Sequence, residues 1–584
     1  MEVARPLLSF MQSREQLFAA QAKTPFENWL APLVALIAST IGTISQYPAL
    51  VNDYIINGDV PQHVYWMQQF RDSELFKNDL LTDFAKSIQP WGAIAVYRLL
   101  SFISDPLWVS KVLPIVLLVV SSVYVFRLVK YLAGNVTGFI ASLLFMIMPV
   151  FPGVMAGGTP RAYVYPLLIS FLFYLIRKDF FKTSVILLLQ PLFYPSIFFV
   201  CGLAYFLAFV EMRPFRLVKQ HAGRILYFTA AVSLGVALLA GKYLLDQNPN
   251  LGTMVTKDQA ASWPELSVEG RYAVFPTAPL HEAVIQQTRA TFMPLIAYSP
   301  IYLALREFKP ASLSPGTLKS FIWWSIPFIV LVGVAFLVVE IKRGQVVFPR
   351  ELLYLLVASA IMYELADLVF LKLWLPSRYI QYSLAVVTLV FVSLAIGRIL
   401  AKVTRPGMKA LASGVVIGIL LLHFNINQNA GMDNQSDKKE FFEYLGTLPK
   451  NSLIAAYPTL ADYIPTFSKR KVFLNQELSQ PSHDTYWLSI RARTYEFFDA
   501  YYAGDLAKVA KFCDKNHIDY LIVDKRHFSR EFLEQRRLYF EPFNSYIKKI
   551  TRDKSEYALL QNLPKLITFQ DGNILVIRVS TLAT

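Results

Sequence analysis

The sequence predicts a polytopic transmembrane helical bundle, mainly α in class, with a soluble α/β domain at its C-terminal end. Of the 584 residues, 55% are hydrophobic and 17% are charged, whereas about a quarter of the residues of a soluble domain are charged. Apolar runs long enough to cross a bilayer, roughly 20 residues each, recur up to residue 425. Beyond that point they stop, and short helix-like and strand-like segments alternate.

The apolar segments give the order of the candidate spans. They lie at 30–50, 107–130, 134–151, 162–177, 183–211, 222–245, 320–340, 351–373, 379–400 and 409–425. The segment 183–211 is too long for one easy crossing and contains Pro191 and Pro195. Proline kinks or ends a helix because it lacks a backbone donor. We therefore expect two shorter spans joined near Tyr194-Pro195, which makes about eleven spans in all.

Basic residues orient these spans. Clusters of Lys and Arg follow every second span, and with eleven spans they all share one side with the N-terminus. The positive-inside rule makes that side cytoplasmic. Residues 1–29 are then a cytoplasmic segment, 30–425 the transmembrane module with extracytoplasmic loops 51–106 and 246–319, and 426–584 an extracytoplasmic domain. We expect an integral, multi-pass protein of the bacterial inner (plasma) membrane. The net charge of +15 follows from these loops and does not predict nucleic-acid binding.

The C-terminal segment, 426–584, has the pattern of a compact α/β domain. Two stretches have helical periodicity, "DKKEFFEYLGTLP" and "DLAKVAKFCDKNH". Four short apolar runs are typical of strands, "SLIAAY", "KVFLN", "DYLIVD" and "NILVIRV". The segment is long enough to bury a core of its own. The stretch "YIPTFSKRKVFLNQELSQPSHDTYW", rich in aromatic and basic residues, is a candidate for acceptor recognition, although such mixtures are common on ordinary surfaces.

The first polar loop carries an unusual share of acids. Between residues 51 and 90 there are six acids and three bases. Asp59 and His63 are four residues apart, so they would share a face if "VPQHVYWMQQF" is helical, with Val64 and Met67 facing the membrane surface. Such a face could hold a hydroxyl and a phosphate, or a metal. Charge alone equally fits acids that only solvate a loop and cap helices.

The architecture resembles the GT-C superfamily, polytopic glycosyltransferases that use sugars linked to lipid phosphates. The stretch "NGDVPQHVYW", shortly after the first span, is similar to the first acidic motif of that superfamily. The kinked spans in mid-chain and the soluble C-terminal domain fit as well. The sequence departs from the family in the turn after the third span, where "GGTPRAY" offers Arg161 instead of a second acid. It also lacks the WWDYG-like signature of oligosaccharyltransferase catalytic subunits.

The resemblance implies a membrane glycosyltransferase that moves a sugar from a polyprenyl-phosphate donor, with inversion, to a lipid, glycan or protein acceptor outside the cytoplasm. The acceptor hydroxyl needs a carboxylate as base, and the departing phosphate needs cations. We assign the base to Asp59, with Asp53 as second choice and Asp79 and Asp83 behind it. Arg161 and Arg378, at span ends on the loop side, are candidate phosphate ligands. His63 is a further candidate for substrate binding.

The sequence lacks motifs that would identify a metal site, and one other functional class remains as an alternative. The sequence has no metal-ligand spacing, so no metal ligands are assigned, although a divalent cation such as Mg²⁺ or Mn²⁺ remains compatible with a lipid-phosphate donor. The alternative is a lipid or solute transporter, or a non-catalytic membrane assembly subunit. Acids in mid-span would favour transport, and Glu364 and Asp367 are the candidate pair.

Overall fold

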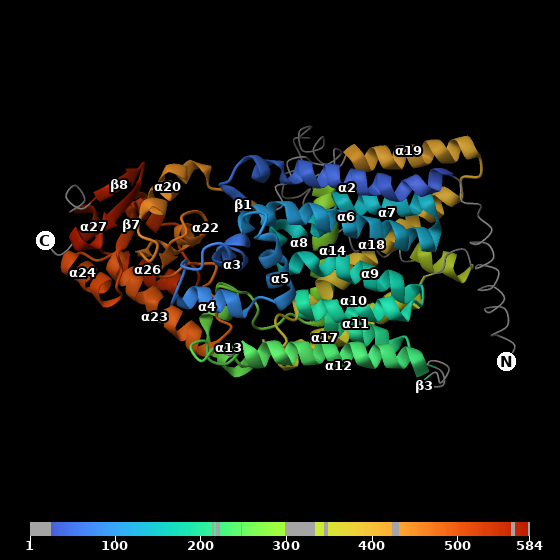
Figure 1. Cartoon of the computed structure of the whole chain (residues 1–584), viewed down its shortest axis with the longest axis horizontal. Coiled ribbons are helices and arrows are strands. Elements are labelled where there is room, and N and C mark those ends of the chain that lie inside the picture. Colours follow the sequence, from blue (N-terminus) through green and yellow to red (C-terminus); the bar gives the residue numbers. More distant parts are fainter. Residues whose placement is uncertain are drawn as a thin grey trace, which may run out of the picture.

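The computed structural model describes residues 25–212, 215–217, 222–246, 248–297, 333, 335–343, 348–422, 431–561 and 567–581. The N-terminal segment 1–24 and most of the span expected at 320–340 lie outside these residues. The described chain forms a bundle of long helices with an α/β domain at one end (Figure 1).

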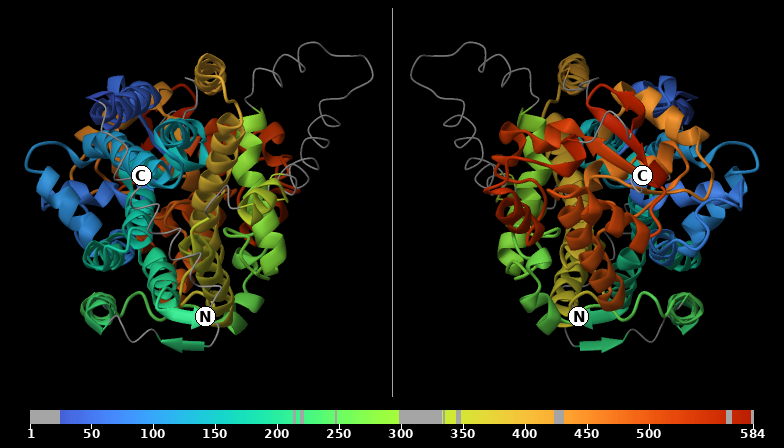
Figure 2. Two further views of the ribbon diagram at one scale, coloured as in Figure 1. Left: turned by 90° about the vertical axis from the view of Figure 1, so that its right-hand side faces the viewer. Right: turned by 90° about the vertical axis from the view of Figure 1, so that its left-hand side faces the viewer.

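The helices of the bundle coincide closely with the expected spans. Figure 2, which looks along the bundle, shows most of these helices end-on, with α19 at its margin. They are α2 Pro25–Val51, α6 Pro106–Ala133, α7 Asn135–Ile147, α8 Val150–Met155, α9 Val164–Ile176, α10 Phe180–Phe193, α11 Pro195–Leu207, α12 Ala222–Leu245, α17 Arg350–Leu368, α18 Ser377–Ala401 and α19 Pro406–Leu422.

The predicted break in the segment 183–211 is confirmed. Helix α10 ends at Phe193, Tyr194 is extended, and Pro195 is the first residue of α11. Proline suits a first helical position because no helical partner is lost there. The predicted class is confirmed as a mostly helical chain with a small sheet, but the count of about eleven spans is not. Among the described helices, four are long and apolar enough to cross a membrane, and the bent pair of α7 and α8 makes a fifth.

Two polar loops of the transmembrane module lie between the bundle and the α/β domain. The first loop contains β1 Ile55–Asn57, α3 Val60–His63, the 3₁₀ helix η1 Tyr65–Phe70, α4 Leu80–Ser87 and α5 Trp91–Leu100. The second contains α13 Lys257–Ser262 and η5 Pro264–Leu266 and continues into α14 Leu280–Ala297, which packs against α18 within the bundle (Figure 1). A hairpin of β2 Val210–Met212 and β3 Phe215–Leu217 follows α11.

The single helix expected after Asp59 is broken into α3 and η1. Val64 and Met67 pack in the core rather than at a membrane surface.

The C-terminal domain is built on a five-stranded sheet in the order β6-β5-β7-β9-β8. Strands β6, β5 and β7 are parallel, whereas β9 runs antiparallel to both β7 and β8. The strands are β4 Met432–Asn434, β5 Leu453–Ala455, β6 Lys471–Val472, β7 Tyr520–Asp524, β8 Ile567–Asp571 and β9 Ile574–Arg578. The helices are η6 Ser436–Lys438, α20 Lys439–Thr447, α21 Pro458–Ala461, α22 Ile464–Phe467, α23 Asp484–Tyr501, α24 Leu506–Lys515, η7 Lys525–Phe528, α25 Arg530–Leu533, α26 Phe543–Thr551, α27 Ala558–Gln561 and η8 Val579–Thr581.

Local patterns in this domain were predicted correctly, and one long-range pairing was not. Strands β5, β6, β7 and β9 and helices α20 and α24 fall inside the predicted segments. Strand β4 stands outside the five-stranded sheet and pairs antiparallel with β1, so that Ile56 lies opposite Asp433. Gly58 also donates its amide hydrogen to Gly431. The first loop and the start of the C-terminal domain are therefore joined by backbone hydrogen bonds.

A buried ion pair joins the second loop to the C-terminal domain. Arg491 of α23 donates two hydrogen bonds to Glu265, at 2.6 and 2.7 Å, and the Glu265 side chain is fully buried. We expect Arg491→Met to destabilise the protein by about 3–5 kcal/mol, because it leaves a buried carboxylate without its cation. Thermal unfolding in lipid nanodiscs measures this loss, and limited proteolysis of 248–297 locates it.

A matched control is Arg536→Met, which removes an exposed partner of Glu269 in the same loop. Exposed pairs contribute roughly 0–1 kcal/mol, so this variant should unfold close to the wild type. Equal effects of the two substitutions would contradict the role given to the buried pair.

Candidate functional site

Asp59 and Arg161 form an ion pair at the junction of the bundle and the first loop. Asp59 precedes the first residue of α3, and its amide nitrogen donates to the Asn57 side chain. Arg161 lies in a short 3₁₀ helix, η3 Pro160–Tyr163, between α8 and α9. Both side chains are about 30% exposed, at 29% for Asp59 and 30% for Arg161. The pair is thus accessible to a ligand while partly shielded from water.

A glycine turn brings Arg161 to this position. Gly157 has a φ of +76°, and a Cβ atom there would lie 2.7 Å from the Asn57 side-chain oxygen. Only glycine adopts this backbone easily and permits so close an approach. The turn "GGTPRAY" therefore presses against the residue two positions before Asp59, which places the guanidinium beside the carboxylate.

His63 lies close to both charges and is electrically neutral. Burial lowers the pKa of His63 to about 4; the Asp59 charge opposes this shift, and the Arg161 and Arg378 charges add to it. The side-chain amide nitrogen of Gln89 lies 2.6 Å from Nδ1 of His63. With that amide donating, Nδ1 accepts and Nε2 carries the ring proton. His63 is therefore a neutral hydrogen-bond donor near neutral pH.

Arg378 completes a group of cations around Asp59. It is the second residue of α18, and its Nη1 atom lies 3.4 Å from both Gln381 Oε1 and the Tyr382 hydroxyl. Asp59 also interacts electrostatically with Arg378. The Nε atoms of Arg161 and Arg378 are buried and have no hydrogen-bond partner among the described residues. Buried donors are normally paired, so these two arginines can receive an anion.

The other acids proposed for the site have different surroundings. Asp53 is 90% exposed and lies 3.9 Å from Lys111. Asp79 caps α4 by accepting from the amide and hydroxyl of Thr82, and burial raises its pKa. Asp83 lies in the first turn of the same helix. The structure thus brings together Asp59, His63, Arg161 and Arg378, whereas Asp53, Asp79 and Asp83 are elsewhere in the loop.

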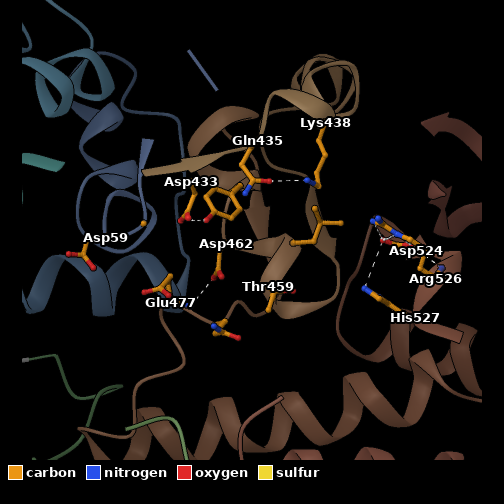
Figure 3. Close-up of a pocket in the computed structure, with 14 residues that line it drawn as sticks. Asp59, Asp433, Gln435, Lys438, Thr459, Asp462, Glu477, Asp524, Arg526 and His527 are labelled. Carbon is orange, nitrogen blue, oxygen red and sulfur yellow. Dashed lines mark hydrogen bonds and ion pairs between the residues drawn. The ribbon is translucent and has the colours of Figure 1, made fainter. Parts of the chain in front are cut away.

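Asp59 also faces a cavity of about 550 Å³ that extends into the C-terminal domain (Figure 3). The cavity is also lined by acids that the sequence reasoning did not single out, Asp433, Asp462 and Glu477. Burial is the main cause of a raised pKa at both Asp462 and Glu477. Within the stretch flagged for acceptor recognition, Tyr463, Gln476 and Glu477 line the cavity. In contrast, Asp484 of that stretch accepts hydrogen bonds from Thr253.

The second loop contributes two further residues to this region. Arg271 lies 3.3 Å from Glu477 and donates from Nε to the backbone oxygen of Gln476. Tyr272 is close to the same charges, and burial raises its pKa to about 12. The sequence did not single out either residue, and Arg271 acquires its place through a hydrogen bond to Gln476, 205 positions further along the chain.

On the side of the bundle, the neighbours of Asp59 are not ligands for a divalent cation. They are two guanidinium groups and a neutral imidazole, whereas Mg²⁺ and Mn²⁺ prefer several carboxylate or carbonyl oxygens. No group of three or more His, Cys, Asp or Glu residues in the described ranges is arranged to hold a metal ion. Cys201 and Cys513 are both free and buried.

The neutral state of buried histidines predicts a pH dependence of stability. Burial lowers the pKa of both His63 and His527 to about 4, against about 6.5 in an unfolded chain. Between these values the unfolded state binds more protons, so the free energy of unfolding falls as pH falls from about 6.5 towards 4. We expect His63→Gln to lose stability less steeply than the wild type over this window, in thermal unfolding at several pH values. His281→Gln, at an exposed histidine, should not change the slope, and equal slopes for wild type and His63→Gln would contradict the burial of His63.

Comparisons with known proteins agree with the fold. No protein-family model and no curated protein sequence matches the chain. Among solved structures, the chain is similar to the apo oligosaccharyltransferase of Archaeoglobus fulgidus, with 12% identity, a TM-score of 0.50, and coverage of 88% of this chain and 71% of that chain. The complex of that organism's oligosaccharyltransferase AglB with an inhibitory peptide and a dolichol-phosphate is 12% identical, with a TM-score of 0.49 and coverage of 87% of this chain and 71% of that chain. Apo ArnT from Cupriavidus metallidurans is 11% identical, with a TM-score of 0.44 and coverage of 96% of this chain and 100% of that chain. The first of these similarities shows that the chain shares its overall fold with that oligosaccharyltransferase, which agrees with the predicted architecture.

Proposed function

We propose that this protein is an inverting membrane glycosyltransferase that transfers a sugar from a polyprenyl-phosphate donor to an acceptor hydroxyl outside the cytoplasm. The observation that carries the proposal is the Asp59 carboxylate, half-buried and paired with Arg161, beside the cation Arg378 and the neutral donor His63. The likeness of fold to an oligosaccharyltransferase is consistent with it.

The arrangement can separate the two charges that the reaction creates. The acceptor oxygen forms a bond to the anomeric carbon while its proton passes to the Asp59 carboxylate. The bond from that carbon to the phosphate oxygen breaks at the same time, and the polyprenyl phosphate leaves with an added negative charge. Arg378 and Arg161 can receive this charge through their unpartnered Nε atoms, and His63 can add a neutral hydrogen bond from Nε2. A single displacement of this kind inverts the anomeric centre.

The transport alternative loses its main support in the sequence. Glu364 and Asp367 lie in the last two turns of α17 rather than at mid-span. Glu364 is exposed, and Asp367 forms a 2.8 Å ion pair with Lys257 of α13 in the second loop. Asp367 therefore joins that loop to the end of the bundle, which is a structural role.

We further propose that the C-terminal domain and both loops face the extracytoplasmic side of a bacterial inner membrane.

Removing the proposed base should remove the activity. We expect Asp59→Asn to lower kcat at least about 100-fold, the lower end of what a general base contributes. The measurement is release of sugar from labelled polyprenyl-phosphate sugars by the full chain in nanodiscs, with water as acceptor. Thermal unfolding verifies that the variant is folded. Glu74→Gln, an exposed acid of the same loop, is the matched control and should retain full activity. Full activity in folded Asp59→Asn, or a loss that follows Asp53→Asn instead, would contradict the role of Asp59.

Removing the proposed phosphate ligand should weaken donor binding. We expect Arg378→Met to raise the Kd for polyprenyl phosphate about 10- to 100-fold, since a hydrogen bond to a charged group contributes about 1.5–3 kcal/mol. Arg378→Lys should recover part of this loss because it keeps the charge without the planar fork. Native mass spectrometry of the protein in nanodiscs measures the binding.

The control for this measurement is Arg350→Met, an exposed arginine at the opposite end of the bundle, which should bind like the wild type. Unchanged affinity in Arg378→Met would exclude Arg378 as a phosphate ligand.

A further inference from the structure

The cavity beside Asp59 has a definite place in the C-terminal domain. Its floor is formed by segments that follow three parallel strands: Thr459 to Tyr463 after β5, Gln476 and Glu477 after β6, and Asp524 to His527 at the end of β7. In open α/β sheets, ligands bind outside the carboxyl ends of the parallel strands, because the connecting loops splay apart there. The cavity therefore occupies the position at which such a sheet binds ligands.

The opposite wall belongs to the first loop and the segment paired with it. Gly58 and Asp59 lie on this side, together with Asp433, Gln435 and Lys438 around strand β4. Figure 3 shows Asp59 at one end of the cavity and Asp524, Arg526 and His527 at the other. A molecule bound against the sheet would thus reach the proposed base with one end.

The described residues of the lining offer no free cation to an anionic occupant. Five carboxylates line the cavity, those of Asp59, Asp433, Asp462, Glu477 and Asp524. The two cations that line it are already paired, Arg526 with Asp524 at 2.6 Å and Lys438 with Asp437 at 2.8 Å. Burial lowers the pKa of His527 to about 4, so this histidine adds no charge at neutral pH. Of the five carboxylates, those of Asp433 and Asp462 have no ion-pair partner among the described residues, so a phosphate or carboxylate placed here would lie beside two acids and meet no free cation.

The remaining polar groups suit a molecule rich in hydroxyls. Carboxylates accept hydrogen bonds from hydroxyl groups, and the side chains of Thr459, Gln435 and Gln476 can both donate and accept. The volume of about 550 Å³ lies within the range of small-molecule sites, about 300–1,000 Å³. An extended peptide would instead add to the lateral edge of a sheet, whereas this cavity lies at the strand ends.

We propose that this cavity is the acceptor site and that it binds a carbohydrate head group without phosphate or carboxylate. The inference rests on the proposed function, in which the hydroxyl to be glycosylated meets Asp59. It adds the class of acceptor: a neutral or amino sugar, held between the carboxyl end of the sheet and the first loop.

Saturation-transfer NMR on the full chain in nanodiscs, which avoids sugar-based detergents, tests this without any transfer reaction. The probes are methyl glycosides of neutral hexoses and of amino hexoses, hexose phosphates, and short peptides. Thr459→Val and Gln476→Ala each remove one polar side chain at the cavity, and Glu440→Gln on α20 changes an exposed acid elsewhere in the domain. We expect neutral or amino hexosides to bind and each cavity variant to raise their Kd about 2- to 10-fold, the effect of one hydrogen bond. Glu440→Gln should bind like the wild type.

Binding of hexose phosphates or peptides in preference to hexosides would overturn the inference, as would equal binding by wild type and both cavity variants. Donor hydrolysis, measured on the same samples, reports the proposed function separately. Hydrolysis that depends on Asp59 in a protein that binds no hexoside would refute the acceptor site and leave the glycosyltransferase proposal standing. Hexoside binding without hydrolysis of any donor would refute the glycosyltransferase proposal and leave the carbohydrate site standing.

Discussion

The ion pair between Asp59 and Arg161 is the contact on which the arrangement of the site depends. It links the first polar loop to the turn between α8 and α9, and so fixes the position of the loop relative to the bundle. A carboxylate that is 29% exposed keeps much of its hydration, and its cation stabilises it without burying it completely. Such a pair can be opened by a ligand. A phosphate that competes for Arg161 would release the carboxylate to accept a proton.

The pairing of β1 with β4 connects the Asp59–Arg161 ion pair to the C-terminal domain. Asn57 is opposite Met432, and its side chain donates to the backbone of Gly431, so the two residues before Asp59 are held by the domain. Asn57 also contacts the Gly157 turn that precedes Arg161. One residue therefore joins the bundle, the first loop and the domain. A shift of the domain would move Asp59 relative to Arg161, and this couples the cavity in the domain to the geometry of the proposed base.

Local sequence patterns predicted much of the fold, and long-range contacts limited the prediction of the site. Apolar length located the helices of the bundle, the prolines located the break at Tyr194, and short apolar runs located four strands of the domain. Arg161 and Arg378 were chosen because they lie at ends of predicted spans on the loop side. Asp59 was chosen for the resemblance of "NGDVPQHVYW" to an acidic motif, and His63 for its spacing of four residues from Asp59. Asp433, Asp462 and Glu477 could not be chosen in this way, since contacts between distant segments bring them to the first loop, among them the β1–β4 pairing and the packing of α22 against α3. Val64 and Met67 were misjudged for the same reason: an apolar stripe facing a membrane and one facing another domain look alike in sequence.

The charges around Asp59 are unequal on its two sides, and this asymmetry can orient a reaction. The guanidinium groups of Arg161 and Arg378 belong to the bundle, where a lipid-linked phosphate would arrive from the membrane. Asp433, Asp462 and Glu477 belong to the domain, where they can accept hydrogen bonds from hydroxyl or ammonium groups. An anionic donor and a hydroxyl-bearing acceptor would therefore enter from opposite sides of one carboxylate, in agreement with a direct displacement. In the proposed reaction Asp59 would receive the proton at the boundary of the two fields, and this position suits it to act as the base.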